Sequence, residues 1–313
     1  MLVSVIFNFK NEEKNISTLI SRTKKVFEDQ RLVDCDFELV FVNDASTDNS
    51  VKEIIQNSSE ISIAIVNMSR NFGRWPCLVA GVKNAKGDVL IYLDSDLQDP
   101  PELIPQMIDK YREGFEIVHA KRTRRLGENP FKLIITNFAY RIIRFLSNIK
   151  LENNVSDYKL ISKRVANHLL EFHDRDPYVR GITVWLGFKQ TYINYERQGR
   201  NSGKSQYPLF GKGPALEFIR GITSFSTSIL YLLFTIGVVS ILAAILLSIY
   251  FVYLKLFGSI APGVATLSIL ILILFAIIIF FIGTISLYLA RIIEETTNRP
   301  LYIVDEIIKI NEN

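Results

Sequence analysis

Two carboxylates and an amide follow an apolar run in the sequence Asp-Ser-Asp-Leu-Gln-Asp-Pro-Pro at residues 94–101. If residues 89–93 form a β-strand and the backbone stays extended beyond it, side chains two positions apart share a face. Asp94, Asp96 and Gln98 would then lie side by side at the end of that strand. Oxygen ligands of this kind suit Mg²⁺ or Mn²⁺ bound together with the phosphates of a substrate. The segment therefore predicts a metal–phosphate site.

The same segment could be only a polar turn ahead of a helix, and Asp99 with the two prolines that follow it suits that role. Asp94 and Asp96 differ, because carboxylates at the end of an apolar strand cost free energy when they are buried without a partner. A metal or a cationic ligand would remove that cost. A metal would also offset the charge of a diphosphate leaving group.

A further carboxylate, Asp44, ends another predicted strand at residues 37–42. Asp48 or Ser46 can cap the helix predicted at residues 50–56. Asp44 is then available to accept a hydrogen bond from a ligand, for instance from the ring N–H of uracil. Because Asp44 and Asp94 both end strands, we expect them to act on the same ligand.

Basic residues form two sets. Arg122, Arg124 and Arg125 follow a predicted strand at residues 117–120, and a glycine-containing segment at residues 196–205 holds the second set, which is Arg197, Arg200 and Lys204. Such runs are often only solvated surface. The glycines favour instead a loop that closes on an anion, and the guanidinium fork matches phosphate geometry. We therefore expect phosphate binding, chiefly by Arg122 and Arg200.

Alternating elements must position these side chains. We expect strands at residues 3–9, 37–42, 61–67, 89–93 and 117–120, and helices at residues 15–27, 50–56, 75–84 and 101–111. This alternation predicts an α/β fold with a mostly parallel sheet covered by helices. In such sheets ligands bind beyond the carboxyl ends of the strands, which is where Asn8, Asp44 and Asp94 fall.

Composition limits the remaining possibilities. The chain has 313 residues and a formal net charge of +4, which gives no reason to expect a nucleic-acid partner. Cys35 and Cys77 are far apart and offer neither a disulfide framework nor a metal-binding pair. The apolar run at residues 2–9 is short and lacks a basic leader, so it predicts a buried strand rather than a signal peptide.

Two long apolar stretches stand out near the end of the chain. The 34 residues between Arg220 and Lys255, and the 35 between Lys255 and Arg291, contain no Asp, Glu, Lys or Arg. A spanning helix needs about 20 apolar residues. We predict transmembrane helices at about 229–254 and 264–290, joined by a turn at 257–263. Two core helices of a soluble protein are the alternative, but both stretches are long and uniformly apolar for that.

Charge around these stretches indicates the topology. Basic residues precede the first predicted span and follow the second, which places both chain ends in the cytoplasm. Residues 1–218 then form a cytosolic domain and residues 291–313 a cytosolic tail. Within the domain, apolar residues spaced three and four apart at 131–149 predict a helix in the membrane interface or an ordinary half-buried helix. A second interfacial helix is expected at 208–224.

A set of motifs in this order resembles a known family. The motifs are Val-Ile-Phe-Asn-Phe-Lys-Asn-Glu-Glu at 5–13, Val-Asn-Asp-Ala-Ser-Thr-Asp at 42–48, Arg-Asn-Phe-Gly at 70–73, the segment 94–101, Ser-Asp-Tyr-Lys-Leu at 156–160, Arg-Asn-Ser-Gly-Lys-Ser-Gln-Tyr at 200–207 and Arg-Pro-Leu-Tyr at 299–302. The chain resembles family 2 glycosyltransferases of GT-A fold, specifically the polyisoprenyl-phosphate glycosyltransferases. These include dolichol-phosphate mannose synthase and the GtrB-type bactoprenol glucosyl transferases. The resemblance covers nearly all of residues 1–305.

The resemblance implies a role for each matching position. It implies nucleotide-sugar binding by Glu12, Asp44, Asp94 and Ser95, metal binding by Asp94, Asp96 and Gln98, binding of the acceptor phosphate by Arg122, Arg200 and Lys204, and catalysis by Asp96 and by Asp157 as the base. A strict base role for Asp157 is open to question. A phosphate monoester is largely dianionic at neutral pH and has little proton to lose. The alternatives for Asp157 are to orient Lys159 or Arg200, or to position the sugar.

Some positions depart from the commoner family pattern. Ala45 stands in place of glycine and Lys159 in place of arginine. No departure removes a predicted metal ligand or a predicted acceptor arginine. The departures leave the nucleotide base and the sugar open.

The reaction implied is inverting transfer of a sugar to polyprenyl (undecaprenyl) phosphate at the cytoplasmic face of a bacterial inner membrane. Two predicted spans favour the bacterial type, hence UDP-glucose and next a UDP-N-acetylhexosamine, with Mg²⁺ or Mn²⁺. Membrane lipid is an expected partner, and a homo-oligomer such as a tetramer is possible. The alternatives are a GDP-mannose:dolichyl-phosphate mannosyltransferase, a non-catalytic membrane scaffold and a processive polysaccharide synthase. The last class has Gln-x-x-Arg-Trp, and Arg74-Trp75 here lacks that glutamine.

Overall fold

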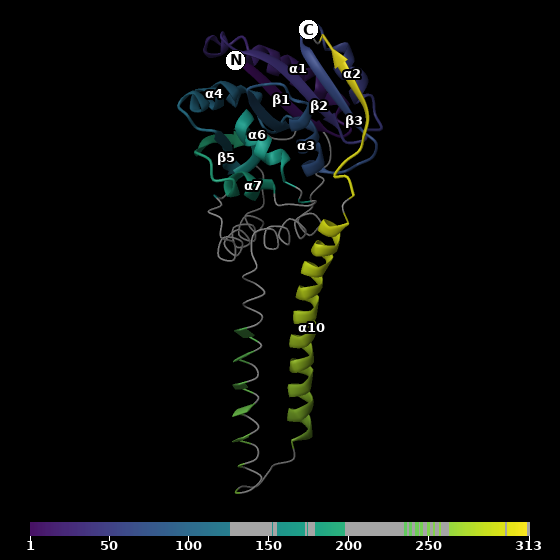
Figure 1. The fold of residues 1–313 in the computed structure, drawn as a ribbon, viewed down its shortest axis with the longest axis vertical. Coiled ribbons are helices and arrows are strands. Elements are labelled where there is room, and N and C mark those ends of the chain that lie inside the picture. Colours follow the sequence, from purple (N-terminus) through teal and green to yellow (C-terminus); the bar gives the residue numbers. More distant parts are fainter. Residues whose placement is uncertain are drawn as a thin grey trace. The chain divides into compact units, whose positions relative to one another are not determined.

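The computed structural model describes residues 1–125, 152, 155–172, 174, 179–197, isolated positions between 235 and 257, 263–297 and 299–311 (Figure 1). The described residues belong to two compact units. One contains the chain up to residue 197 together with the last strand, and the other contains the long helix α10.

The first unit is built on one eight-stranded sheet with the order β7-β5-β6-β4-β1-β2-β3-β8. The strands are β1 Leu2–Phe9, β2 Asp36–Asn43, β3 Ser62–Met68, β4 Val89–Asp94, β5 Ile117–Arg125, β6 Val155–Ser162, β7 Gln190–Arg197 and β8 Val304–Ile310. Neighbours β4, β1, β2 and β3 run parallel, as do β5 and β7, whereas β6 is antiparallel to both of its neighbours. The predicted α/β fold with a mostly parallel sheet is confirmed.

One predicted strand is longer than its sequence indicates. We expected a strand only at residues 117–120, but β5 continues through Arg122 to Arg125. Its basic second half pairs with β7, where Arg125 lies opposite Arg197. Ladder hydrogen bonds to β7 extend the strand despite its charged residues, because pairing context outweighs local preference in sheets.

Helices cover the sheet. They are α1 Glu13–Val26, α2 Ser50–Gln56, α3 Arg74–Asn84, α4 Ile104–Arg112, α6 Lys163–Leu170 and α7 Val179–Trp185, with short 3₁₀ turns η1 Gln30–Leu32 and η2 Pro101–Leu103. The helix predicted at residues 101–111 is therefore η2 followed by α4. Helix α3 approaches the sheet closely at Gly81, where an added Cβ would lie 2.4 Å from Ile6 Cγ2. The absence of a side chain at Gly81 thus sets the distance between α3 and β1.

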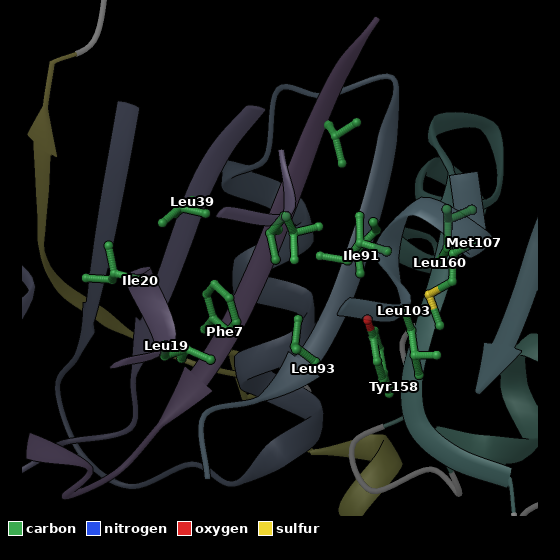
Figure 2. Packing of buried hydrophobic residues seen from close by; sticks show 14 of the residues in the cluster. Phe7, Leu19, Ile20, Leu39, Ile91, Leu93, Leu103, Met107, Tyr158 and Leu160 are labelled. Carbon is green, nitrogen blue, oxygen red and sulfur yellow. The ribbon is translucent and has the colours of Figure 1, made fainter. Parts of the chain in front are cut away.

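The main hydrophobic cluster lies on the face of β1 opposite to α3. Figure 2 shows part of it, in which Phe7, Ile91 and Leu160 from the strands pack with Leu19 and Met107 from the helices. These residues are fully buried or nearly so. Because β1 alternates its side chains, its odd-numbered residues join this cluster while Ile6 meets α3. A sheet covered on both faces is rigid, and its strand ends can hold a site.

The last residues complete the sheet instead of forming only a tail. Strand β8 pairs antiparallel with β3, and the side chain of Asn311 donates hydrogen bonds to the carbonyls of Ser58 and Ile61 at 2.9 and 3.2 Å. Within the tail predicted at 291–313, the structure thus adds a strand of the sheet. Sequence reasoning missed β8 because its partner is about 240 residues away, as the pairing of Val66 with Ile307 shows.

The second unit is described through α10, Val264–Thr296. Within the described part of the chain, this is the helix whose length and composition would allow it to cross a membrane, and its window Ile273–Ala290 has a mean hydropathy of 2.6. It covers the second predicted span and continues to Thr296. Most of the first predicted span and both predicted interfacial helices, 131–149 and 208–224, lie outside the described residues.

Candidate functional site

A cleft of about 230 Å³ lies at the carboxyl ends of the parallel strands. The residues around it come from strand ends and from the loops that follow them, and they are Asn8, Phe9, Lys10, Glu12, Asp44, Asn71, Gly73, Arg74, Asp94, Ser95 and Asp96. In-register pairing places Asn8 beside Asp94, and Phe9 beside Asn43. The ends of the parallel strands and the loops that follow them therefore bring together the predicted site residues Glu12, Asp44, Asp94, Ser95 and Asp96.

The backbone does not stay extended beyond Asp94, which corrects our initial expectation. The chain turns after β4, and Leu97 adopts a positive φ of 58° with its side chain buried. Left-handed backbone is uncommon for a bulky residue and is held here by the surrounding packing. Gln98 is not among the residues that line the cleft, and its backbone N–H donates to Asp96 Oδ1 at 3.2 Å. Its role as a metal ligand stays a prediction.

Arg74, the first residue of α3, joins two carboxylates. Its Nη2 donates to Asp94 Oδ2 at 3.0 Å, and its Nη1 donates to Asp157 Oδ2 at 2.6 Å. Asp94 ends β4 and Asp157 lies in the antiparallel strand β6. We call Arg74, Asp94 and Asp157 the Arg74 cluster.

The Arg74 cluster carries an excess of negative charge. The pKa of Asp94 is raised to about 6, chiefly by burial and in part by the charges of Asp96, Asp157 and Asp99, although the charge of Arg74 lowers it. Arg74 therefore offsets only part of the charge at this strand end. Additional positive charge would be stabilised here.

The donor set fits a divalent cation bound together with substrate phosphates. Asp94 and Asp96 both line the cleft and offer carboxylate oxygens, the ligands that Mg²⁺ and Mn²⁺ prefer. The described residues contain no group of three or more His, Cys, Asp or Glu side chains arranged to hold a metal. Such a site would depend on the substrate to complete the coordination, as is usual for Mg²⁺ at phosphate sites.

Asp44 holds the loop that leads to Arg74. Its Oδ1 accepts a hydrogen bond from the backbone N–H of Phe72 at 2.7 Å, and its Oδ2 accepts one from that of Gly73 at 3.2 Å. The carboxylate also borders the cleft. Its contact with the nucleotide base stays a prediction. Ala45, which stands where the family commonly has glycine, adopts a positive φ of 57°.

Two other predicted nucleotide-sugar contacts also have protein partners. The carboxylate of Glu12 accepts a hydrogen bond from Asn15 Nδ2 at 2.5 Å, and the hydroxyl of Ser95 donates to the carbonyl of Asn8 at 2.8 Å. Both residues border the cleft. Their side chains are therefore fixed before any ligand arrives.

Asp99 is the centre of a second cluster, although we had assigned it only to a turn. The side chain is 1% exposed, and Oδ1 accepts a hydrogen bond from the hydroxyl of Tyr195. Arg122 Nη2 lies 3.4 Å from both carboxylate oxygens, and Arg122 Nε donates to the Tyr195 hydroxyl at 2.9 Å. Arg197 Nε lies 3.8 Å from Oδ1. We call Asp99, Arg122, Tyr195 and Arg197 the Asp99 cluster.

The Asp99 cluster has an excess of positive charge. Burial lowers the pKa of Arg197, and the neighbouring guanidinium of Arg122 lowers it further, while Asp99 and Asp96 raise it. Arg197 Nε is buried and makes no hydrogen bond within the described part of the chain. An anion would relieve the repulsion between the two guanidinium groups.

Two consecutive residues of β6 contact the two clusters from opposite faces of the strand. Asp157 meets Arg74 at the start of α3, whereas the next residue, Tyr158, belongs to the core in Figure 2 and packs edge-on against Tyr195 with ring centroids 6.4 Å apart. At the strand ends the two clusters come close enough for the charge of Asp99 to act on Asp94.

The sequence analysis missed the roles of three of these residues. Two other residues that it predicted for the site are not among those that the structure describes. It gave no role to Arg74 or Tyr195, and it gave Asp99 only a turn; Arg200 and Lys204 fall outside the described residues. One signal for Arg74 was available, since it follows the loop after β3 and so reaches the same sheet edge as Asp44. Tyr195 had no such signal, because β7 was not predicted.

Comparison with known proteins decides the family. The family model described as "Glycosyl transferase family 2" matches residues 4–170. The chain belongs to glycosyl transferase family 2. Its resemblance to the GtrB-type members is supported along nearly the whole chain.

Several curated relatives of this glycosyltransferase cover almost its full length. A prophage bactoprenol glucosyl transferase homolog of Escherichia coli is 34% identical, with 99% of this chain and 100% of the relative aligned. The bactoprenol glucosyl transferase of Shigella phage SfII is 34% identical over 97% of each chain. A Bacillus subtilis protein named uncharacterized glycosyltransferase YkcC is 36% identical, with 97% of this chain and 93% of the relative aligned.

A solved structure supports the fold of the family 2 domain. Glucosyl-3-phosphoglycerate synthase from Mycobacterium tuberculosis, in complex with Mn²⁺, UDP-glucose and phosphoglyceric acid, matches with a TM-score of 0.50 and 17% sequence identity. The match covers 71% of this chain and 78% of that one. The glycosyltransferase therefore has a GT-A-like α/β fold.

Proposed function

We propose that this glycosyltransferase transfers a sugar from a UDP-sugar to polyprenyl phosphate, with glucose as the favoured sugar and N-acetylhexosamine next. The names of the full-length relatives support the acceptor class and the choice of glucose. The observation that carries the proposal is the adjacency of an acidic and a basic cluster at one sheet edge. A metal-bound donor suits the first and an acceptor phosphate the second.

The donor would lie in the cleft. Asp44 and Glu12 border its wall on the side of β1 and β2, where we expect the nucleotide, and Asp94 with Asp96 would hold Mg²⁺ or Mn²⁺ together with the diphosphate. The metal would supply positive charge that stabilises the diphosphate as a leaving group. The chain's own contribution is to fix the two carboxylates at the end of a buried strand.

The acceptor phosphate would bind near Arg122 and Arg197. Two guanidinium groups around one carboxylate leave a net positive charge, and the guanidinium fork matches phosphate oxygens. We propose that Arg200 and Lys204 add to this site, since they follow β7 closely in sequence.

The reaction would be a direct displacement. An oxygen of the acceptor phosphate attacks the anomeric carbon, the bond from that carbon to the diphosphate breaks, and the configuration inverts. The attacking phosphate is largely dianionic at neutral pH, so no proton has to be removed. We therefore give Asp157 a positioning role, in line with its ion pair to Arg74. Catalysis would consist of alignment and charge stabilisation.

We also propose a two-helix membrane hairpin with the sheet domain on the cytoplasmic side. Strand β8 follows α10 and pairs with β3, which precedes the apolar stretches, so the chain must leave and re-enter on the same side of a bilayer. If α10 spans, a second crossing is required, and the apolar residues 221–254 are long enough for one. The distribution of basic residues favours the cytoplasmic side.

Transfer assays test the proposed function directly. Purified full-length protein would be incubated with undecaprenyl phosphate, Mn²⁺ or Mg²⁺ and one radiolabelled donor at a time, namely UDP-glucose, UDP-N-acetylglucosamine or GDP-mannose. We expect a labelled chloroform-soluble product from UDP-glucose that EDTA abolishes. The matched variants are Asp96→Asn, in the cleft, and Asp109→Asn, a surface carboxylate on α4 that pairs with Arg31.

Each possible outcome bears on a separate part of the proposal. Product from GDP-mannose and none from UDP-sugars would reject the donor class. Product that persists in EDTA would reject the metal requirement. A folded protein that binds UDP but transfers from no donor would reject polyprenyl phosphate as the acceptor.

A further inference from the structure

We propose that Arg74 changes partners when the donor binds. Its guanidinium moves from the carboxylates of Asp94 and Asp157 to the diphosphate of the donor. This exchange makes binding of the metal and binding of the donor depend on each other. The inference rests on the proposed function, because it takes a nucleoside diphosphate sugar as the donor.

The geometry makes Arg74 the member of its cluster that can move. Its side chain is 41% exposed, whereas those of Asp94 and Asp157 are 13% and 12% exposed. Both carboxylates are carried by strands of the central sheet, and Arg74 reaches them with the two ends of one guanidinium. A flexible side chain can leave such a bridge without any strand movement.

The backbone on either side of Arg74 is anchored. The N–H of Gly73 is bound by the Asp44 carboxylate, and Trp75 is buried with its Nε1 donating to the carbonyl of Asp174 at 2.9 Å. The start of α3 therefore stays in place while the side chain changes partners. The exchange needs no movement of a loop or lid.

Electrostatics favours the exchange only when a diphosphate is present. A cation held by Asp94 would lie beside the Arg74 guanidinium, and the two positive charges would repel each other. A guanidinium that simply left Asp94 would lose a charge-assisted hydrogen bond. The diphosphate of a donor in the same cleft provides new oxygen acceptors in the geometry that arginine prefers. The metal thus drives Arg74 away from Asp94, and the diphosphate accepts the hydrogen bonds of the released guanidinium, so each ligand favours binding of the other.

The same exchange reaches Asp157. Arg74 donates to Asp157 at 2.6 Å in the observed arrangement. Once the guanidinium turns to the diphosphate, this contact is removed as well. The orientation of Asp157 for transfer is then set only after the donor is bound, which links donor binding to alignment of the reacting groups.

Binding measurements on the full-length protein test the exchange without relying on turnover. The affinity for Mn²⁺ is measured by electron paramagnetic resonance with and without saturating UDP, and the affinity for UDP is measured by calorimetry at saturating Mn²⁺. In Arg74→Gln we expect Mn²⁺ without UDP to bind about tenfold more tightly, and UDP to bind about tenfold more weakly, than in the wild type. The two changes have opposite signs, which a merely structural role would not produce.

Two further variants keep the test decisive. Arg22→Gln removes a guanidinium that pairs with Glu102 away from the cleft, and it should change neither affinity. Arg74→Lys retains the charge but cannot bridge two carboxylates, so it should show both changes in smaller measure. If circular dichroism shows that Arg74→Gln does not fold, Arg74→Lys carries the test.

The outcomes separate the inference from the proposed function. Tighter Mn²⁺ binding with unchanged UDP affinity would make Arg74 a passive neighbouring charge and would overturn the exchange. Weaker binding of both ligands would make its role structural and would overturn it too. If wild-type protein does not bind UDP at any Mn²⁺ concentration, the proposed donor class fails first, and the exchange fails with it.

Discussion

The Arg74 cluster and the Asp99 cluster contain the same kinds of side chain in opposite proportions. In the first, one guanidinium lies between two carboxylates, and in the second, two guanidinium groups lie around one buried carboxylate. The first therefore has an excess of negative charge and the second an excess of positive charge. Each is suited to a ligand of the opposite charge. The two clusters lie apart because consecutive side chains of β6 point to opposite faces of the sheet.

This difference shows how one strand end can serve two ligands. Asp96 and Asp99 are three residues apart, yet Asp96 borders the cleft and Asp99 is buried among arginines. The left-handed backbone at Leu97 lies between them and turns the chain from one side to the other. A short segment thus divides its carboxylates between the cleft, where we propose that a cation binds, and the Asp99 cluster, where we propose that an anion binds.

The largest effect should come from Asp96→Asn, which halves the carboxylate set proposed for the metal. Amide oxygen is a weaker ligand than carboxylate, and charge stabilisation of the leaving group would be lost. We expect kcat for sugar transfer to fall by about 10²–10³-fold. Transfer of radiolabelled sugar measures kcat, with Asp109→Asn as the control. Near-normal turnover by Asp96→Asn would reject a metal role for the carboxylates of the cleft.

Asp157→Asn should cause the next largest loss. The amide keeps the shape but loses the charge, so Asp157 no longer positions the reacting groups after Arg74 has turned to the donor, and we expect kcat to fall by about 10²-fold. The loss should be the same at neutral and alkaline pH, because a dianionic phosphate needs no base. A profile of kcat against pH checks this. Recovery of activity at high pH would show instead that Asp157 removes a proton.

Arg122→Met tests the basic side. It removes one of the two guanidinium groups and retains an apolar stem, so we expect the KM for polyprenyl phosphate to rise about tenfold or more, in line with loss of a hydrogen bond to a charged group. The KM for the UDP-sugar should change little. Steady-state kinetics with each substrate varied in turn measure both, and a rise confined to the UDP-sugar would move Arg122 to the donor site.

The smallest effect on activity should come from Tyr195→Phe. The hydroxyl donates to Asp99 and accepts from Arg122, so its loss leaves Arg122 less well oriented while every charge is retained. We expect the acceptor KM to rise only a few-fold, and the free energy of unfolding to fall by about 1–3 kcal/mol because Asp99 loses a hydrogen bond while buried. Thermal denaturation alongside kinetics measures the two. An unchanged acceptor KM with lowered stability would limit Tyr195 to a structural role.

Much of the first half of the fold could be predicted from local patterns. Strands β1 to β4 are apolar runs followed by turns, and the helices between them have regular spacing, so their positions agree with the structure within a few residues. Strand β5 was predicted too short, because Arg122 to Arg125 reads as surface. Strands β6, β7 and β8 were missed, because their partners lie far away along the chain.

The site divides along the same line. The grouping of Glu12, Asp44, Asp94 and Asp96 in one cleft follows from strand order, because the ends of parallel strands meet at one edge. The turn of the backbone after Asp94 could not be predicted, since it depends on Leu97, a left-handed residue held by packing. The pairing of Arg74 with Asp157 spans 83 residues and leaves no local signal.

The sequence by itself determined the residue types, the strands that carry them and the long apolar stretches, because periodicity and side-chain chemistry are local properties. Only the tertiary structure decided which charges face each other. Strand pairing chose the neighbours of each carboxylate, the turn at Leu97 chose the face, and burial of Asp99 fixed the arginines around it. Charges act through space over a few ångströms, so their balance depends on the fold rather than on distance along the chain.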